Sequence, residues 1–425
     1  MTRSPRTTGA PARPAGPLRA LVRPVYLPSF VYAVGAGALV PVQVLLALRL
    51  GFDTAGVSAL MTWIGAFAIF SSAAAGWIVE AFGERRAVVV TTTVGVAGLL
   101  VAAASAWWSL PGARWVLVVA LTLFDLVDAV WSIARQSLVT DLVPSSFRGR
   151  AMNLYGACQR LGRAVGPAAA SAVLLVTGPT AVLPLIVVVV GAATALLARR
   201  RPTGRDRGPA LDGAQPPSPP SAAVAGTASS RAFGRGQVAA LGTGVLVLAA
   251  LRTSKESLLP LWAAQGAHLP DQRVALLMAL ASCAELVLFW PAGLALDRLG
   301  RGPVVACAMA LMGVGTLLVP ASTSPAWLVA CVVLIGLGDG TGSGIIKTIG
   351  ADLAPATGRS VFLGRWQAVA SAGSLLAPAL ASALIAMVSL PAAAVAIGAL
   401  GVAGAAWMGA WTPRVLPRSL TSAHA

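Results

Sequence analysis

Apolar runs long enough to cross a lipid bilayer recur along almost the whole chain. A membrane-spanning helix needs roughly 20 mainly apolar residues, because about 30 Å of hydrocarbon must be crossed at 1.5 Å per residue. Hydrophobic residues make up 57% of the sequence and charged residues only 11%, which is typical of a polytopic membrane protein. The sequence predicts twelve spans: 27–48, 55–81, 87–108, 115–139, 152–176, 181–198, 238–263, 274–296, 304–319, 327–349, 362–387 and 392–411.

The segments outside these spans have a different composition. Residues 1–25 are basic and rich in proline and lack the cleavage site of a signal peptide, so we expect a disordered tail. Residues 200–236 are rich in Pro, Ser, Gly and Arg and cannot form a packed core, which predicts a linker. The expected organisation is therefore a six-helix bundle over 26–199, a second over 237–412 and a short tail over 413–425.

The arginines fall on alternate connections between the spans. Because short loops rich in Arg and Lys stay on the cytoplasmic side, we expect both termini in the cytoplasm and the protein in the cytoplasmic membrane. The formal net charge of +17 is then explained by the arginines that set the membrane topology. Because these arginines flank apolar runs and do not cluster on a folded polar face, no nucleic-acid partner is expected. These arginines are Arg85, Arg86, Arg148, Arg150, Arg199 to Arg201, Arg298, Arg301, Arg359 and Arg414.

The sequence offers little for catalysis or for metal binding. Its four cysteines are singly spaced, and its two histidines, His268 and His424, lie in a predicted loop and in the tail. This pattern indicates neither a disulfide framework nor a zinc site nor an activated nucleophile. The glycine-rich stretch "GLGDGTGSG" follows no predicted strand, so it is not a nucleotide-binding loop. We expect no enzyme activity, no cofactor and no direct drive by ATP.

The two halves of the chain repeat each other. "GWIVEAFGERR" (76–86) and "GLALDRLGRGP" (293–303) share the spacing of two glycines and an acid, and each follows the second span of its half. "DLVPSSFRGR" from Asp141 and "DLAPATGRSV" from Asp352 also align. Because each half has an even number of spans, the repeats are related by a pseudo-two-fold axis along the membrane normal. The shared register pairs Asp128 with Asp339, Gly162 with Gly373 and Pro167 with Pro378.

With these motifs the chain resembles the major facilitator superfamily over nearly its whole length. "GLALDRLGRG" is close to the loop signature of that family, and the first copy departs by carrying Glu80 for the usual aspartate. "GRAVGP", with Gly162, Gly166 and Pro167, is similar to the fifth-helix motif of the drug and proton antiporter branch, although Asn153 departs from that motif and the branch's fourth-helix arginine is missing. The resemblance implies a secondary transporter that rocks its two bundles around a central site.

The resemblance also implies a cytoplasmic gate at the loop motif. The glycines permit a tight turn and close helix approach, and the acid can meet the positive end of a neighbouring helix or an arginine. The alternative is that these residues only anchor the topology. Gly162 and Gly166 predict a small-residue face against a neighbouring helix, with Pro167 bending the helix, or else ordinary close packing. The gate residues are Gly76, Glu80, Gly83, Arg85, Gly293, Asp297, Arg298, Gly300 and Arg301.

Charged residues within the predicted spans are the candidate functional residues. Each costs at least ~2.5–3.5 kcal/mol at the bilayer centre, so they are expected to face the bundle interior. Asp125, Asp128, Ser132 and Arg135 are spaced by three, four and three residues and predict one polar stripe. The glycines around Asp339 predict a bendable tenth helix. The candidates for proton coupling are Asp128 and Asp339, followed by Glu285, Glu256 and Asp125; those for the substrate cavity are Arg252, Lys255, Gln43, Arg160, Arg163, Lys347 and Arg135.

Two interpretations of these charges compete. They form a static network, such as Arg135 with Asp128, or a buried carboxylate takes up and releases a proton while the cations attract substrate. The five candidate acids and the seven bases within the predicted spans, Arg365 included, cannot all pair one to one, which favours function for some of them. We predict a monomer in the lipid bilayer that exports a small organic molecule against proton entry. The alternatives are a proton-coupled importer of an organic anion and a membrane sensor or scaffold that transports nothing.

Overall fold

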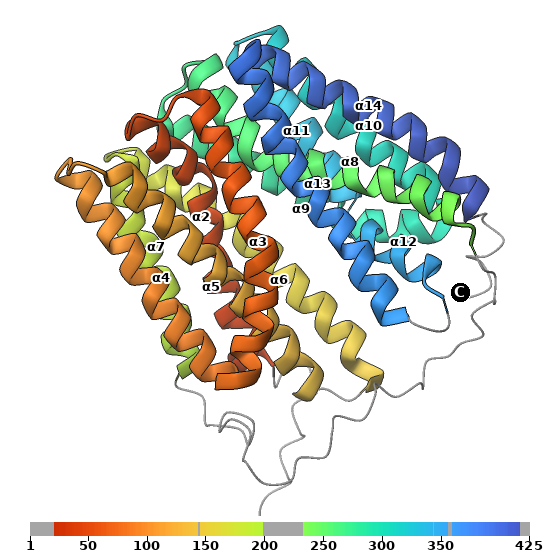
Figure 1. Ribbon diagram of the computed structural model, residues 1–425, viewed down its shortest axis with the longest axis horizontal. Coiled ribbons are helices and arrows are strands. Elements are labelled where there is room, and N and C mark those ends of the chain that lie inside the picture. The colour runs from red at the N-terminus through yellow and green to blue at the C-terminus, as the bar shows by residue number, and fades with distance from the viewer. Residues whose placement is uncertain (1–20, 143–144, 199–232, 343, 356–358, 417–425) are drawn as a thin grey trace, which may run out of the picture.

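The computed structural model describes residues 21–142, 145–198, 233–342, 344–355 and 359–416, and within them every regular element is a helix. Figure 1 shows that the long helices form two bundles. The first contains α2 (Leu27–Arg49), α3 (Thr54–Phe82), α4 (Glu84–Trp107), α5 (Ala113–Leu142), α6 (Ser145–Leu174) and α7 (Val182–Ala198). The second contains α8 (Arg235–Leu261), α9 (Asp271–Leu299), α10 (Arg301–Leu318), α11 (Pro325–Thr341), α12 (Ile345–Leu353), α13 (Arg359–Met387) and α14 (Leu390–Val415). The predicted all-α fold of two bundles is confirmed.

The helices match the predicted spans one for one. In the described part of the chain, 11 helical segments are long and apolar enough to cross a membrane, with α11 and α12 counted as one. The twelfth is α6, which falls below that hydropathy because it carries Gln159, Arg160 and Arg163. Those three side chains line a cavity, so the low hydropathy of α6 reflects its position at the interior.

The tenth span is divided at its glycines. α11 ends at Thr341, α12 begins at Ile345, and Gly344 between them has a φ of +78°. That left-handed conformation is strained for residues with a Cβ, so glycine permits the break. The weak point predicted in "GLGDGTGSG" therefore coincides with a real interruption.

The chain ahead of the first span is more ordered than the prediction of a disordered tail over 1–25. Val22–Tyr26 forms the short helix η1, whose apolar side packs against Tyr155 of α6. The helix forms because its apolar side chains can be buried there. α8 and α14 likewise extend a few residues into the predicted linker 200–236 and the predicted tail 413–425.

The two bundles use the same helix pairings. α2 packs on α6, and α3 and α4 on α5; in the second bundle α8 packs on α13, and α9 and α10 on α11. A Cβ placed on Gly162 would lie 2.6 Å from the Phe30 carbonyl oxygen of α2, and Gly166 meets the same helix one turn later. Gly373 likewise meets the backbone of Leu246 on α8. Small residues thus bring the equivalent pairs, α2–α6 and α8–α13, to backbone contact.

The second and third helices of each bundle are joined by a single glycine. Gly83 connects α3 to α4 with a φ of +75°, and Gly300 connects α9 to α10 with a φ of +83°. Both turns lie at the end of the molecule where α7 ends and α8 begins, which we call the linker side; the opposite end is the far side.

The bundles contact each other mainly toward the far side. Ser171 Oγ of α6 donates to the Gln272 carbonyl of α9 at 3.1 Å, and Ser382 Oγ of α13 donates to the Ala55 carbonyl of α3 at 3.1 Å. Figure 1 shows α3 and α13 diverging toward the linker side. Within the described residues we find no cross-bundle hydrogen bond or ion pair in the linker-side half.

Candidate functional site

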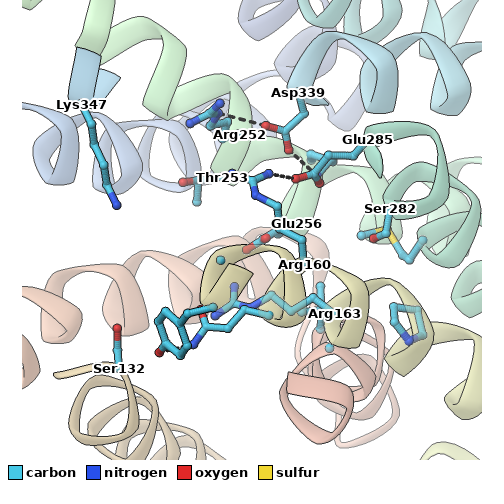
Figure 2. A pocket seen from close by; sticks show the side chains of 18 of the residues that line it. Ser132, Arg160, Arg163, Arg252, Thr253, Glu256, Ser282, Glu285, Asp339 and Lys347 are labelled. Atoms are coloured by element: carbon cyan, nitrogen blue, oxygen red, sulfur yellow. Dashed lines mark hydrogen bonds and ion pairs between the residues drawn. The ribbon is translucent and has the colours of Figure 1, made fainter. Parts of the chain in front are cut away.

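A cavity of about 710 Å³ lies between the two bundles, from mid-depth toward the linker side. Figure 2 shows its charged side chains converging from opposite helices. The first bundle contributes Gly37, Val40, Ser132, Gln136, Tyr155, Gly156, Gln159, Arg160, Arg163 and Pro167. The second contributes Arg252, Thr253, Lys255, Glu256, Met278, Ser282, Glu285, Asp339 and Lys347.

The segment "LRTSKESLLP" supplies the charged face of α8. Lys255 and Glu256 follow Arg252 by three and four residues, the spacing that places side chains on the same face of a helix as Arg252. All three line the cavity, and Thr253 between them does so as well. The apolar residues of the segment, such as Leu251 and Leu258, are buried in the bundle.

Lys255 is the centre of an ion-pair network. Its ammonium group pairs with Glu285 of α9 at 2.9 Å and with the Asp339 carboxylate of α11. Arg252 Nε lies 2.9 Å from Asp339 Oδ1, and Arg252 Nη2 donates to the Gly342 carbonyl at 2.6 Å. Lys255 and Asp339 are almost completely buried, so these charges are held by each other instead of by water.

The network crosses from one bundle to the other at Arg160. This α6 side chain pairs with Glu285, so Glu285 accepts from a cation of each bundle. The Arg160 guanidinium also lies 4.9 Å from the ring centroid of Phe289 on α9, within the range of a cation–π interaction. The position of α6 relative to α9 is therefore linked to the charge of Glu285.

The acids of α5 have separate partners. Arg163 Nη2 lies 3.3 Å from Asp128 Oδ2, and both side chains are more than a third exposed. Asp125 instead accepts a hydrogen bond from Ser71 of α3 at 2.5 Å. Asp128 and Asp125 are thus not part of the cavity lining, although Asp128 contacts it through Arg163.

Two charged residues of the cavity are unpaired. Glu256 and Lys347 are both exposed to the cavity, and among the described residues neither makes an ion pair or a hydrogen bond. The other cations of the lining, Arg160, Arg163, Arg252 and Lys255, each contact a carboxylate.

Two predicted cavity residues lie elsewhere. Arg135 is 1% exposed and donates to the Pro24 carbonyl of η1 at 3.2 Å, outside the cavity lining. The members of the predicted polar stripe of α5 therefore contact different elements: Asp125 contacts α3, Asp128 contacts α6 and Arg135 contacts η1. Gln43 of α2 is half-buried and is also absent from the lining, which at α2 is formed by Gly37 and Val40.

The predicted gate residues lie near the linker-side ends of α3 and α9 and in the turns that follow, and among the described residues none of them bridges the two bundles. Arg85 donates to the Ala198 carbonyl at the end of α7, and Arg301 Nε donates to Asp352 of α12 at 3.0 Å. Glu80 is exposed with no hydrogen bond or ion pair among the described residues, and Arg298 is exposed. Gly76 does not mediate close packing, since a Cβ there would meet nothing within 4 Å. The side chain of Asp297 and the environment of Gly293 lie outside what the structure describes.

The sequence analysis did not identify three uncharged residues of the lining, Gln136, Tyr155 and Ser282. Gln136 donates to Ser132 at 3.0 Å, and Gln159 donates to the Tyr155 hydroxyl. Each of these pairs is four residues apart, and Ser282 precedes Glu285 by three. Helical spacing from the polar residues already identified was the signal that could have found them.

A cross-bundle ion pair on the far side was also missed. Arg49 Nη2, at the end of α2, lies 2.6 Å from Asp271 Oδ2 at the start of α9, and the Arg49 side chain is 54% exposed. Its members are ordinary charges at helix ends, so only the three-dimensional structure reveals the pairing.

Arg49→Gln is expected to increase the fraction of molecules open on the far side. Exposed ion pairs stabilise by only about 0–1 kcal/mol, so thermal stability should change little. The readout is the reaction of a cysteine at Thr253 with a membrane-impermeant maleimide added from the far side, in a variant without native cysteines. Arg114→Gln is the control, because Arg114 stacks on Trp115 of its own helix. Equal labelling of the Arg49 and Arg114 variants would show that the ion pair is not a latch.

Comparison with known proteins agrees with this architecture. A POT family transporter in complex with 5-aminolevulinic acid superposes with a TM-score of 0.72 at 12% identity, covering 94% of this chain and 97% of the other. A mutant POT peptide transporter in complex with alafosfalin gives 0.71 at 18%, covering 92% and 94%. A mutant of the nucleoside transporter NupG gives 0.69 at 12%, covering 93% and 99%. No curated protein matches the sequence.

Two bundles that enclose a charged central cavity define a membrane protein with the fold of a secondary transporter. The sequence matches the Major Facilitator Superfamily over residues 25–270 and 241–424. The chain belongs to that superfamily, and it is a multi-pass membrane protein and not an enzyme. The structures cited are peptide and nucleoside transporters, so the resemblance to the drug and proton antiporter branch rests on the α6 motif alone.

Proposed function

We propose that the protein is a proton-coupled secondary transporter that exports a small organic molecule carrying an anionic group. The observation that supports this most directly is the charged cavity between the bundles. Its volume of about 710 Å³ lies within the roughly 300–1,000 Å³ typical of small-molecule sites. It extends toward one side of the molecule while the bundles are held together on the other, as alternating access requires.

The charge balance of the cavity favours an anionic substrate. Five lining cations face three lining carboxylates, and Asp128, the partner of Arg163, raises the acids to four. One positive charge remains in excess. Buried charge without a counter-ion is unfavourable, so a substrate anion would balance the site. A transport screen should therefore include carboxylates and phosphates together with 5-aminolevulinic acid and nucleosides, which similar folds bind.

Proton binding is assigned first to Glu256. Asp339 and Glu285 each contact two cations, and Asp128 contacts one. Glu256 faces the cavity with no cation in contact among the described residues, so its carboxylate is free to exchange a proton with cavity water. We therefore place Glu256 ahead of Asp128 and Asp339, which reverses the order expected from sequence.

Glu256→Gln is expected to abolish accumulation driven by a pH gradient while leaving substrate counterflow intact. The amide keeps the shape of the side chain but cannot cycle a proton, so coupling is lost and exchange persists. Both rates are measured in proteoliposomes with radiolabelled substrate. Glu80→Gln, a change at an exposed glutamate outside the cavity, is the control. Normal accumulation by both Glu256→Gln and Asp128→Asn would refute proton coupling through these acids. If the wild-type protein moves no compound of the transport screen, the scaffold hypothesis is favoured.

Export is proposed from the α6 motif, and import of an organic anion is the alternative. We also propose that the linker side faces the cytoplasm, from the arginine placement, and that the transporter works as a monomer. Vesicles of both orientations separate the two directions. Proton-driven accumulation only in inverted vesicles supports export, whereas accumulation in right-side-out vesicles contradicts it.

A further inference from the structure

Lys347 is unusual among the cations of the cavity. Within the described residues it is the one lining cation without a carboxylate partner, and its side chain extends into the cavity (Figure 2). It lies on α12, just after the break in the tenth span. The chain contains only two lysines, and the other, Lys255, is 6% exposed and fully engaged in ion pairs.

Arg252 approaches the same break from α8. Its guanidinium makes an ion pair with Asp339, with Nε 2.9 Å from Oδ1 but not hydrogen-bonded, and Nη2 donates to the Gly342 carbonyl. The Nη1 group has no hydrogen-bond partner among the described residues, and 25% of the side chain is exposed. Arg252 therefore presents a fixed, partly unsatisfied donor group to the cavity. Figure 2 places it on the same side of the cavity as Lys347, opposite Ser132 and Arg163.

The helix that carries Lys347 is held in place. Trp366 Nε1 of α13 donates to the Ile346 carbonyl at 2.9 Å, and a Cβ on Gly350 would lie 2.5 Å from the Trp366 ring. The backbone next to Lys347 is thus anchored to α13. A cation on an anchored backbone is preorganised for a ligand in a way that a mobile loop residue is not.

The first bundle lacks this cation. In the register that pairs Asp128 with Asp339, Lys347 corresponds to Gln136, which lines the same cavity from the unbroken helix α5. The neutral Gln136 donates to Ser132. The duplicated scaffold therefore carries an unpaired positive charge at this position in its second half only.

We infer that Arg252 and Lys347 form an oxyanion subsite at the break in the tenth span, which takes the carboxylate, phosphate or sulfonate group of the substrate. Arg252 supplies planar N–H donors and Lys347 a point charge, a combination that suits an oxyanion. The inference rests on the proposed transport of an anion-bearing molecule and names where that group binds.

Lysine chemistry tests the subsite with inorganic sulfate as the probe. The purified full-length protein is treated with a small amine-reactive ester, and acylation of Lys347 is followed by peptide mass spectrometry in sulfate or in chloride of equal ionic strength. Sulfate is expected to slow the acylation of Lys347 in a saturable manner, and chloride to have little effect. Arg252→Gln should weaken this protection by about tenfold or more, the loss for a hydrogen bond to a charged group. Arg252→Lys, which keeps the cation, should retain part of it.

Gln136→Lys provides the matched control, because it places an amine at the corresponding position of the first bundle. Its acylation should respond equally to sulfate and chloride. Protection of Lys347 by sulfate no better than by chloride, or undiminished in Arg252→Gln, overturns the subsite. If sulfate does not protect Lys347 but the protein still transports carboxylates, the subsite is wrong and the proposed function stands. If sulfate protects Lys347 but the protein transports no anion, only the proposed function is contradicted.

Discussion

Asp339→Asn is expected to destabilise the protein strongly and to abolish transport. The substitution keeps the shape of the side chain but removes the charge that holds Arg252 and Lys255. Breaking a buried ion pair by removing one partner costs about 3–5 kcal/mol, because the remaining charge stays buried. The melting temperature of the detergent-purified protein, followed by tryptophan fluorescence, should fall clearly below that of the wild type.

The double variant Asp339→Asn with Lys255→Met separates charge balance from local damage. Removing the ammonium group, which in Asp339→Asn keeps only Glu285 as a carboxylate partner, should restore part of the lost stability, since the energies of residues in one network are not additive. Transport should stay absent, because Lys255 also holds Glu285. A double variant no more stable than Asp339→Asn would show that an unbalanced charge is not the cause of the loss.

Gly166→Ala is expected to produce the second large loss. A Cβ at this position would overlap the backbone nitrogen of Ala38 and the carbonyl oxygen of Val34 on α2. Backbone atoms cannot rotate away as a side chain can, so α2 and α6 must separate. Overpacking costs about 1–3 kcal/mol and occasionally more, and a backbone clash belongs at the upper end. Stability and transport rate should both fall.

Gly156→Ala is the matched control on the same helix, because a Cβ there would meet nothing within 4 Å. Gly373→Ala on α13 should reproduce the Gly166 defect in the second bundle, where the added Cβ overlaps the Leu246 carbonyl. If Gly166→Ala melts at the same temperature as Gly156→Ala, the close contact of α2 with α6 does not contribute to the stability of the protein as predicted.

Much of the fold was accessible from the sequence because its signals are local or repetitive. Span length follows from hydropathy, and the break near Asp339 from the glycines around it. The register between the halves placed Gly162 opposite Gly373, and both lie at equivalent helix contacts. The tight turns at Gly83 and Gly300 could be predicted because glycine readily adopts the positive φ that both residues have.

The partners of the charges were much harder to predict. Asp128 was matched with Arg135, two turns along the same helix, yet its contact is Arg163 on another helix. Which arginine reaches an acid depends on the rotation of each helix about its axis, and hydropathy does not determine that rotation. Arg135 was predicted in the cavity, but it lies beneath η1, a segment most of which fell in the predicted disordered tail. The Arg49–Asp271 pair joins residues more than 200 positions apart, without any motif.

Alternating access requires a central cavity that opens to each side of the membrane in turn. The direct test is the labelling of a single cysteine at Ser282, which lines the cavity on α9, by a membrane-impermeant thiol reagent in oriented vesicles, with the four native cysteines replaced. A cysteine at Val287 of the same helix, where the side chain is 67% exposed outside the cavity, is the comparison. We expect position 282 to react from the linker side at rest and from both sides during turnover, and position 287 from neither. Protection of position 282 from both sides would contradict alternating access through this cavity.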